Sequence, residues 1–208
     1  MVKVKEMTYK KKYAYVLAYI KLNESFILPL VKKHMGNEGI AELISIWQEK
    51  LEVIPDNISN KDKFEIAYSN WLWKMSSAVN FIQAHLGDKG FEEYKRVNIE
   101  ALKKKDSKIK MLILKGINAV SPSLAFSMIE RQMVYELQVF SPAEVTELSK
   151  ERLIFYAQHC KALDYPECIN FCTIGCQKIF PQFFAEHLKV KWTIERQGKS
   201  CTVTLSPL

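Results

Sequence analysis

The stretch "KVKWTIERQGKSCTVTL", residues 189–205, decides the fold class. Apolar residues alternate with polar ones on both sides of the turn residues RQGK: Val190, Trp192 and Ile194 before it, and Cys201, Val203 and Leu205 after it. A period of two is typical of a strand with one buried face. Two such runs joined by a short turn that contains glycine predict a C-terminal β-hairpin.

The first 130 residues have a different period. Their apolar side chains recur at the three- and four-residue spacing of an amphipathic helix. We expect Pro55 to end the second helix and Gly87 to cap the third. We expect no internal repeat. The predicted helices cover residues 9–32, 37–54, 59–87, 89–120 and 121–132.

The segments between these helices and the hairpin carry mixed signals. "MVYELQVF" (133–140) alternates with period two, which predicts a strand. "ERLIFYAQHC" (151–160) fits both a helix and a buried strand, because a short apolar run does not distinguish the two. Residues 165–188 read as a helix that Pro181 kinks or restarts.

The predicted fold class is therefore α+β: a helical N-terminal half, then a small antiparallel sheet packed by a cysteine-bearing helix, with the hairpin at the end. The corresponding division is 1–130 and 131–208, within one integrated domain. No phosphate-binding glycine loop, H-E-x-x-H or G-x-S-x-G motif occurs in the chain, so a nucleotide-dependent enzyme or a serine hydrolase is not expected.

The bulk composition limits the setting and the partners. No uninterrupted apolar run reaches the roughly 18 residues of a membrane span, and the N-terminus does not resemble a signal peptide. Five cysteines, an odd number, argue against a secreted disulfide framework. We therefore expect a cytoplasmic protein without a membrane span. The net charge is +7, but no nucleic-acid-binding motif accompanies it, so nucleic acid is not an expected partner.

The cysteines carry the main functional question. Cys168, Cys172 and Cys176 recur every fourth residue and so share one face of a helix. Cys201 lies on the apolar face of the hairpin, and Cys160 precedes the helix. Three interpretations stay open: ligands of a metal such as zinc, reactive or catalytic thiols, and small buried side chains of a core. The candidate metal ligands are Cys160, Cys172, Cys176 and Cys201.

Residues 148–205 resemble the family named for L-2-amino-thiazoline-4-carboxylic acid hydrolase. The resemblance rests on a strand ending in Cys160, a helix carrying Cys172, and the sequence "TIERQGKSC", which ends in Cys201. It implies that "LIFYAQH" is a strand and that a small heterocycle is hydrolysed at a C–N bond. The candidate catalytic residues are Cys172 and Cys160 as nucleophiles or metal ligands, and Glu195 as general base.

The same region is similar to the V4R (4-vinyl reductase) type of ligand-binding domain. That resemblance implies a structural zinc held by Cys172, Glu195 and Cys201 beside an apolar pocket. Aromatic residues of the N-terminal half would line such a pocket, although residues at this spacing also suit a plain core: Tyr68, Trp71, Trp73 and Phe81. A small-molecule ligand or substrate is the expected partner. Catalysis, simple binding and assembly as a homodimer remain open.

Overall fold

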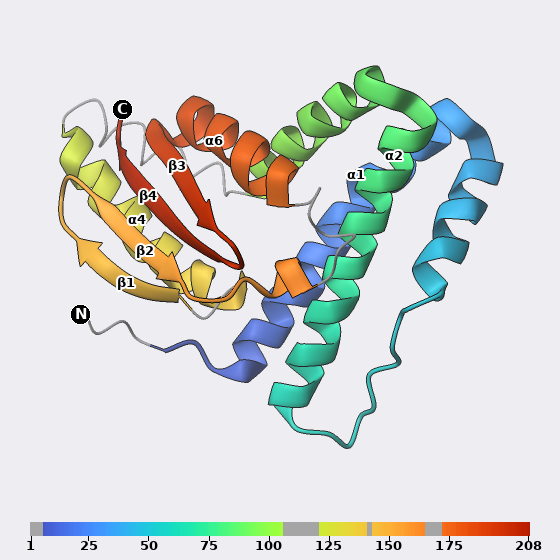
Figure 1. Ribbon diagram of the computed structural model, residues 1–208, viewed down its shortest axis with the longest axis horizontal. Coiled ribbons are helices and arrows are strands. Elements are labelled where there is room, and N and C mark those ends of the chain that lie inside the picture. Colours follow the sequence, from blue (N-terminus) through green and yellow to red (C-terminus); the bar gives the residue numbers. More distant parts are fainter. Residues whose placement is uncertain (1–5, 106–120, 141–142, 165–171) are drawn as a thin grey trace. The chain divides into compact units, whose positions relative to one another are not determined.

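The computed structural model describes residues 6–105, 121–140, 143–164 and 172–208 (Figure 1). These residues fall into two compact units. The helical unit comprises Thr8–Ala101 together with Cys172, and the sheet unit comprises the other described residues. The division expected at residue 130 lies elsewhere, because the helix that follows residue 121 belongs with the sheet.

Two long bent helices form the helical unit: α1 (Tyr9–Gln48) and α2 (Asn60–Lys105). Each bends at one glycine with positive φ, Gly36 at 68° and Gly87 at 59°. We call residues 9–35 and 60–86 the stems, and residues 37–48 and 88–101 the arms. Figure 1 shows α1 and α2 changing direction sharply at these bends. The non-helical Gly36 lies within the gap predicted between residues 32 and 37, and the non-helical Gly87 lies at the predicted end of the third helix, so both interruptions are confirmed.

The two stems run side by side in the same direction. Tyr9 contacts Phe64, and Tyr19 contacts Trp71 further along both helices, with ring centroids 5.9 and 6.3 Å apart. Between the stems lies a core that takes up most of the aromatic cluster noted in the sequence. Its members Tyr68, Trp71 and Phe81 are buried, and Trp71 and Phe64 both pack against Tyr68. The arrangement is the one expected of packed core side chains.

α1 ends at Gln48 rather than at residue 54. The following residues form a loop held by Asn70 of α2, whose side-chain amide accepts from the Glu52 backbone N–H and donates to the Glu52 carbonyl, at 3.0 and 2.8 Å. These bonds satisfy one residue's backbone groups outside any helix. Val53 is 89% exposed, so this apolar residue before Pro55 gains no burial that would stabilise a longer helix.

A four-stranded antiparallel sheet forms the centre of the sheet unit. The strands are β1 (Ala143–Leu148), β2 (Leu153–Ala157), β3 (Val190–Gln197) and β4 (Ser200–Pro207). Their order is β1-β2-β4-β3. The α+β class and the C-terminal hairpin are confirmed. Gly198, the first of the two turn residues, has φ 59°, which suits glycine in a two-residue hairpin turn.

The pleat divides the sheet into a buried face and a polar face. The register places Leu153 opposite Leu205, and Leu205 opposite Trp192; all three are buried. On β3 the intervening residues Lys191 and Thr193 are exposed. Alternation on both hairpin strands therefore follows the predicted period of two.

Helical segments cover the buried face. α4 (Pro122–Phe140) packs against β1 and β4, while η3 (Cys172–Ile179), α6 (Phe180–Phe183) and η4 (Phe184–Leu188) continue into one another and approach β3. η3 and η4 are π-helical, and Pro181 lies within α6. The helix predicted over 165–188 is thus present from Cys172 onward, and its earlier part lies outside the described residues.

Trp192 fixes this helical segment to the sheet. Its ring stacks on Phe184 with centroids 4.9 Å apart and meets the edge of Phe180 at 5.5 Å. Its indole Nε1 donates to the backbone carbonyl of Cys176 at 3.0 Å. The side chain thus buries a large apolar area while its one polar group is hydrogen-bonded, as a buried tryptophan requires.

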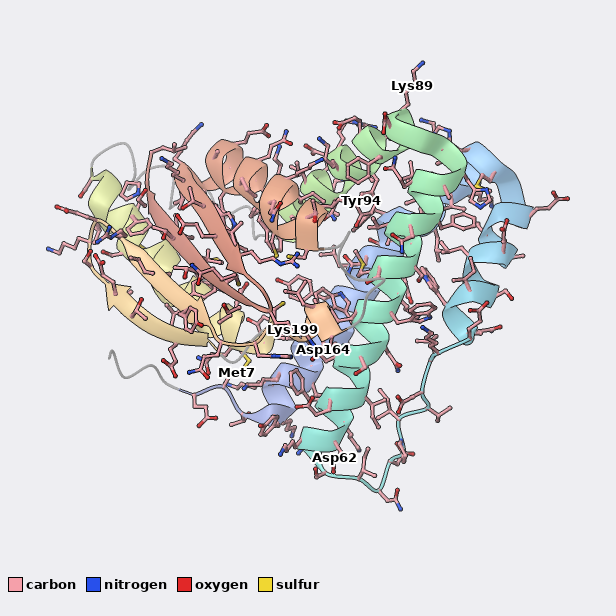
Figure 2. The ribbon with its side chains drawn as sticks, in the orientation of Figure 1. Met7, Asp62, Lys89, Tyr94, Asp164 and Lys199 are labelled. Atoms are coloured by element: carbon pink, nitrogen blue, oxygen red, sulfur yellow. The ribbon has the colours of Figure 1, made fainter. Side chains whose placement is uncertain are left out.

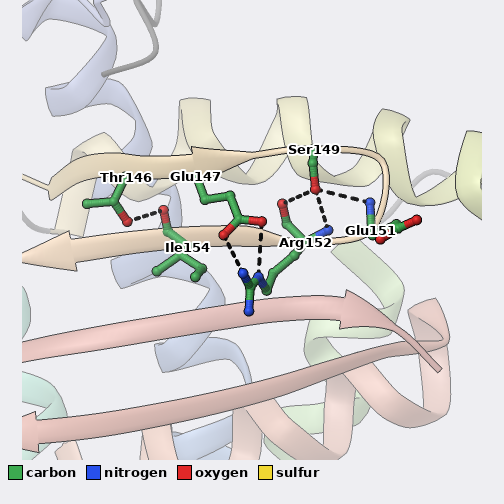
Figure 3. A network of polar contacts seen from close by, with 6 residues as sticks. All are labelled: Thr146, Glu147, Ser149, Glu151, Arg152 and Ile154. Atoms are coloured by element: carbon green, nitrogen blue, oxygen red, sulfur yellow. Dashed lines mark hydrogen bonds and ion pairs between the residues drawn. The ribbon is translucent and has the colours of Figure 1, made fainter.

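Polar contacts close the turn between β1 and β2 (Figure 3). Arg152 donates to both carboxylate oxygens of Glu147, through Nε at 3.0 Å and Nη2 at 2.6 Å. The Ser149 hydroxyl accepts from the backbone N–H groups of Glu151 and Arg152. A bidentate pair and a serine turn together set the register of this hairpin.

The strand predicted over 133–140 is wrong, because these residues continue α4. Buried positions along this helix include Phe126, Ile129, Val134 and Val139. An alternation over only eight residues is weak evidence for a strand, and here the helix that begins at Pro122 continues through these residues. The ambiguous segment at 151–160 forms strand β2, as the family resemblance implied.

One described helix, α1, contains an 18-residue window with the length and mean hydropathy (1.3) of a membrane span, and 33% of that window is buried within the protein. Core helices of soluble proteins have the same length and composition. The fold is compatible with a soluble protein.

Candidate functional site

The end of the sheet where β2 finishes is the part of the described chain in which predicted site residues gather. Residues 158–164 leave β2 and pass the hairpin turn, where the backbone N–H of Cys160 donates to the Lys199 carbonyl at 2.8 Å. A short 3₁₀ turn, η1 (Lys161–Asp164), follows directly. Asp164 and Lys199 lie close together at this end of the sheet in Figure 2.

Asp164 joins two basic side chains. Its Oδ2 lies 2.7 Å from His159 Nε2, and its Oδ1 accepts from Lys199 Nζ at 2.7 Å. Because an ionised carboxylate only accepts, His159 Nε2 carries a proton in this contact, and Nδ1 is then the basic nitrogen of the neutral ring. The hydrogen bonds that the Asp164 carboxylate accepts from His159 and Lys199 lower its pKa.

This lowered pKa makes the contribution of Asp164 depend on pH. A depressed pKa means that the stabilisation is fully present above the ordinary aspartate value and is lost as pH falls through the lowered one. We therefore expect Asp164→Asn to be less stable than wild type at pH 7, with the difference vanishing in the acid range. Urea unfolding from pH 7 down to pH 2 checks this, and a difference independent of pH would contradict it.

Cys201 occupies the buried face of the sheet beside this network. It lies opposite Ala157 of β2 and opposite Arg196 of β3, and it is half-buried, as is Cys160. Two cations of the hairpin beside Cys201 have partners of their own: Arg196 Nε donates to the Gly198 carbonyl, and Lys199 pairs with Asp164. Their positive charge is therefore shared with the turn and not directed at the thiols alone.

Glu195 lies on the other face of the sheet. It pairs with Thr202, one residue out of phase with Cys201, and is exposed like Lys191 and Thr193. Successive strand residues point to opposite faces. The Glu195 carboxylate and the Cys201 thiol therefore lie on opposite faces of the sheet. This geometry does not support Glu195 as a general base or metal ligand beside Cys201.

The remaining cysteines are distributed along and before η3. Cys172 is its first residue, buried, and belongs to the helical unit; Cys176 is half-buried and belongs to the sheet unit. Cys168 lies outside the described residues. Across the described part of the chain, no three His, Cys, Asp or Glu side chains are grouped so that they could hold a metal ion. Zinc binding by Cys160, Cys172, Cys176 and Cys201 stays a prediction.

The sequence indicates His159, directly before Cys160, as the histidine best placed for a chemical role, but no motif in it pointed to Asp164. The signal was present: "HCKALD" (159–164) places an acid five residues after the histidine. A helix would have separated these groups, whereas the turn after β2 brings them together. Whether His159 and Asp164 meet therefore depends on whether residues 151–160 form a helix or a strand, and periodicity did not distinguish the two.

No family model, curated protein or solved structure matches this chain.

Proposed function

We propose that the protein is a small-molecule-binding, hydrolase-like protein of the cytoplasm whose reactive group is the Cys160 thiol. The substrate class is a small heterocycle opened by hydrolysis at a C–N bond, as the family resemblance implies. The observation that supports this site most is the ion-pair network of His159, Asp164 and Lys199, which holds the segment carrying Cys160 against the hairpin turn.

In this proposal Cys160 is the nucleophile, His159 is the general base and acid, and Asp164 orients His159. His159 Nδ1 takes the thiol proton of Cys160, and the thiolate adds to the ring carbon, forming an S–C bond. The C–N bond then breaks, and its nitrogen receives the proton from His159. Water, deprotonated by His159, finally cleaves the S–C bond and restores the thiol. Asp164 holds the histidine in one tautomer and orientation, which is the role of the third group in a nucleophile–base arrangement.

Turnover of 2-amino-thiazoline-4-carboxylate tests the proposal. We expect wild type to open the ring and Cys160→Ala to lose about a thousandfold or more of kcat/KM, as removal of a nucleophile does. His159→Gln is expected to lower kcat with little effect on KM. Cys176→Ala is the matched control, since it removes a half-buried cysteine of the same unit outside the network, and we expect it to retain wild-type turnover.

Two results would count against this proposal. Full turnover by Cys160→Ala excludes Cys160 as the nucleophile. Absence of turnover in wild type, together with about one zinc per chain that chelation removes with loss of folding, favours the V4R-like alternative, a non-enzymatic binding domain with a structural zinc. Metal analysis of the purified protein separates these cases.

A further inference from the structure

A nine-residue pattern occurs twice in the helical unit. "HMGNEGIAE" (34–42) and "HLGDKGFEE" (85–93) share H-x-G-x-x-G-x-x-E, the second copy beginning 51 residues after the first. Both copies stand where a stem meets its arm. The first glycine of each adopts nearly the same backbone angles, φ 68° and ψ −158° at Gly36, and φ 59° and ψ −155° at Gly87.

Burial repeats with the same offset. Nine residues of α1 are buried, and eight of their counterparts in α2 are buried as well. The exception is Asn23, whose counterpart Lys74 is half-buried. α2 buries further residues, among them Tyr68 and Leu72, whose counterparts Leu17 and Lys21 are not buried. The shared positions extend over stems and arms, beyond the shared pattern, and support the interpretation that α1 and α2 are two copies of one bent-helix unit in unequal surroundings. The matching pairs are Val16/Ala67, Phe26/Ser77, Ile27/Ala78, Leu30/Phe81, Val31/Ile82, Gly39/Gly90, Leu43/Tyr94 and Trp47/Asn98.

The histidine and the glutamate of the pattern pair across the two copies. His34 Nε2 lies 2.7 Å from Glu93 Oε2, and His85 Nε2 lies 3.6 Å from Glu42 Oε1. Each contact joins the stem of one copy to the arm of the other. Phe26 of the first stem likewise contacts Tyr94 of the second arm, with ring centroids 5.9 Å apart. An arm bonded only to its own stem would show none of these contacts.

The two crossed contacts differ in strength. Glu93 is 18% exposed and also meets Lys33 at 2.7 Å and Arg96 at 3.7 Å, and the hydrogen bonds from Lys33 and His34 lower the pKa of its carboxyl. Glu42 is 52% exposed and meets His85 at 3.6 Å, while the His85 ring packs on Phe81 at 4.3 Å. The first contact is therefore the better shielded from solvent.

We propose that the helical unit is an internal duplication whose two copies exchange arms, and that His34–Glu93 and His85–Glu42 are reciprocal clasps that hold the exchanged arms in place. This replaces the expectation that the chain has no internal repeat. Each clasp sits at a glycine bend, where the backbone alone does not fix the direction of the arm. A substitution at the end of one stem therefore acts on the arm of the other copy.

Hydrogen exchange of the full-length protein tests this crossing. We expect His34→Gln to speed amide exchange in residues 88–101 about two- to fivefold, the size of effect typical of a surface ion pair, and to leave residues 37–48 unchanged. His85→Gln is expected to do the reverse. Glu93→Gln, which ends contacts with three basic side chains, should exceed His34→Gln. Lys32→Gln and Lys89→Gln change exposed neighbours on a stem and an arm and should change neither.

Faster exchange in residues 37–48 after His34→Gln would overturn the proposal, because it would make His34 a local end group of its own helix. Unchanged exchange in both arms for His34→Gln and for Glu93→Gln would overturn it as well. The variants alter partly exposed side chains, so folding is retained, and Glu42→Gln provides a second, independent reading of the His85 clasp.

Discussion

Replacing Trp192 with alanine is expected to lower the free energy of unfolding by about 3–5 kcal/mol, the range for deleting a large buried aromatic side chain. Trp192 is 6% exposed and contacts rings from the helical segment and from β2, the latter being Phe155 at 6.3 Å. Its removal leaves a cavity at the point where the segment meets the sheet and leaves the Cys176 carbonyl without its indole donor.

Trp192→Phe separates these two effects. It keeps an aromatic ring against Phe184 and loses the hydrogen bond, so we expect a smaller cost of about 1–2 kcal/mol. Val53→Ala, at an 89% exposed position, is the control and should stay within about 0.5 kcal/mol of wild type. Urea unfolding followed by near-ultraviolet circular dichroism measures all three. A cost below about 1 kcal/mol for Trp192→Ala would contradict the packing described here.

Substituting alanine for Gly36 or Gly87 is expected to cost about 1–3 kcal/mol each, because their backbone angles lie in a region that side chains of L-residues rarely adopt. A Cβ at either position would meet no atom within 4 Å, so the cost comes from the backbone alone. The two substitutions should therefore have similar effects, as befits equivalent positions in two copies of one unit.

Gly39 and Gly90 offer a contrast. A Cβ there would lie 2.3 Å from the Met35 Cβ and 2.1 Å from the Leu86 Cβ, so alanine at these positions clashes with an atom close to the main chain. We expect destabilisation at both. Glu38→Ala, an exposed position within the first pattern, is the control. Thermal unfolding measures the series, and a neutral Gly36→Ala beside a costly Gly87→Ala would argue against equivalence of the two bends.

The hairpin was predictable because both of its strands are long enough for period two to be unambiguous, and Gly198 marks the turn. β1 was not predicted, because Pro142 precedes it and two of its six residues are glutamates, which are uncommon in strands. Its alternation is further interrupted by a register shift between Val145 and Glu147. A short strand with one buried face has few apolar positions from which a period of two can be recognised.

The candidate site was predictable only in part. Cys160 and Cys201 were named from the sequence, and both lie at the end of the sheet beside the hairpin turn. Glu195 was named as well, although the alternation along residues 190–195 already placed it on the polar face of the hairpin, opposite to the face of Cys201. The two H-x-G-x-x-G-x-x-E segments are visible in the sequence, yet their meaning depends on contacts between residues more than 40 positions apart, such as His85 and Glu42.

Site-resolved alkylation of the cysteines tests the central claim most directly. The native protein is treated with limiting iodoacetamide at pH 7, and labelling of each cysteine is followed by peptide mass spectrometry. A thiol activated by a neighbouring base reacts faster than ordinary buried thiols. We predict that Cys160 is labelled at least about tenfold faster than Cys176 and Cys201, and that His159→Gln removes this advantage. Equal labelling of the three, or an advantage of Cys160 that survives His159→Gln, would contradict the proposed site.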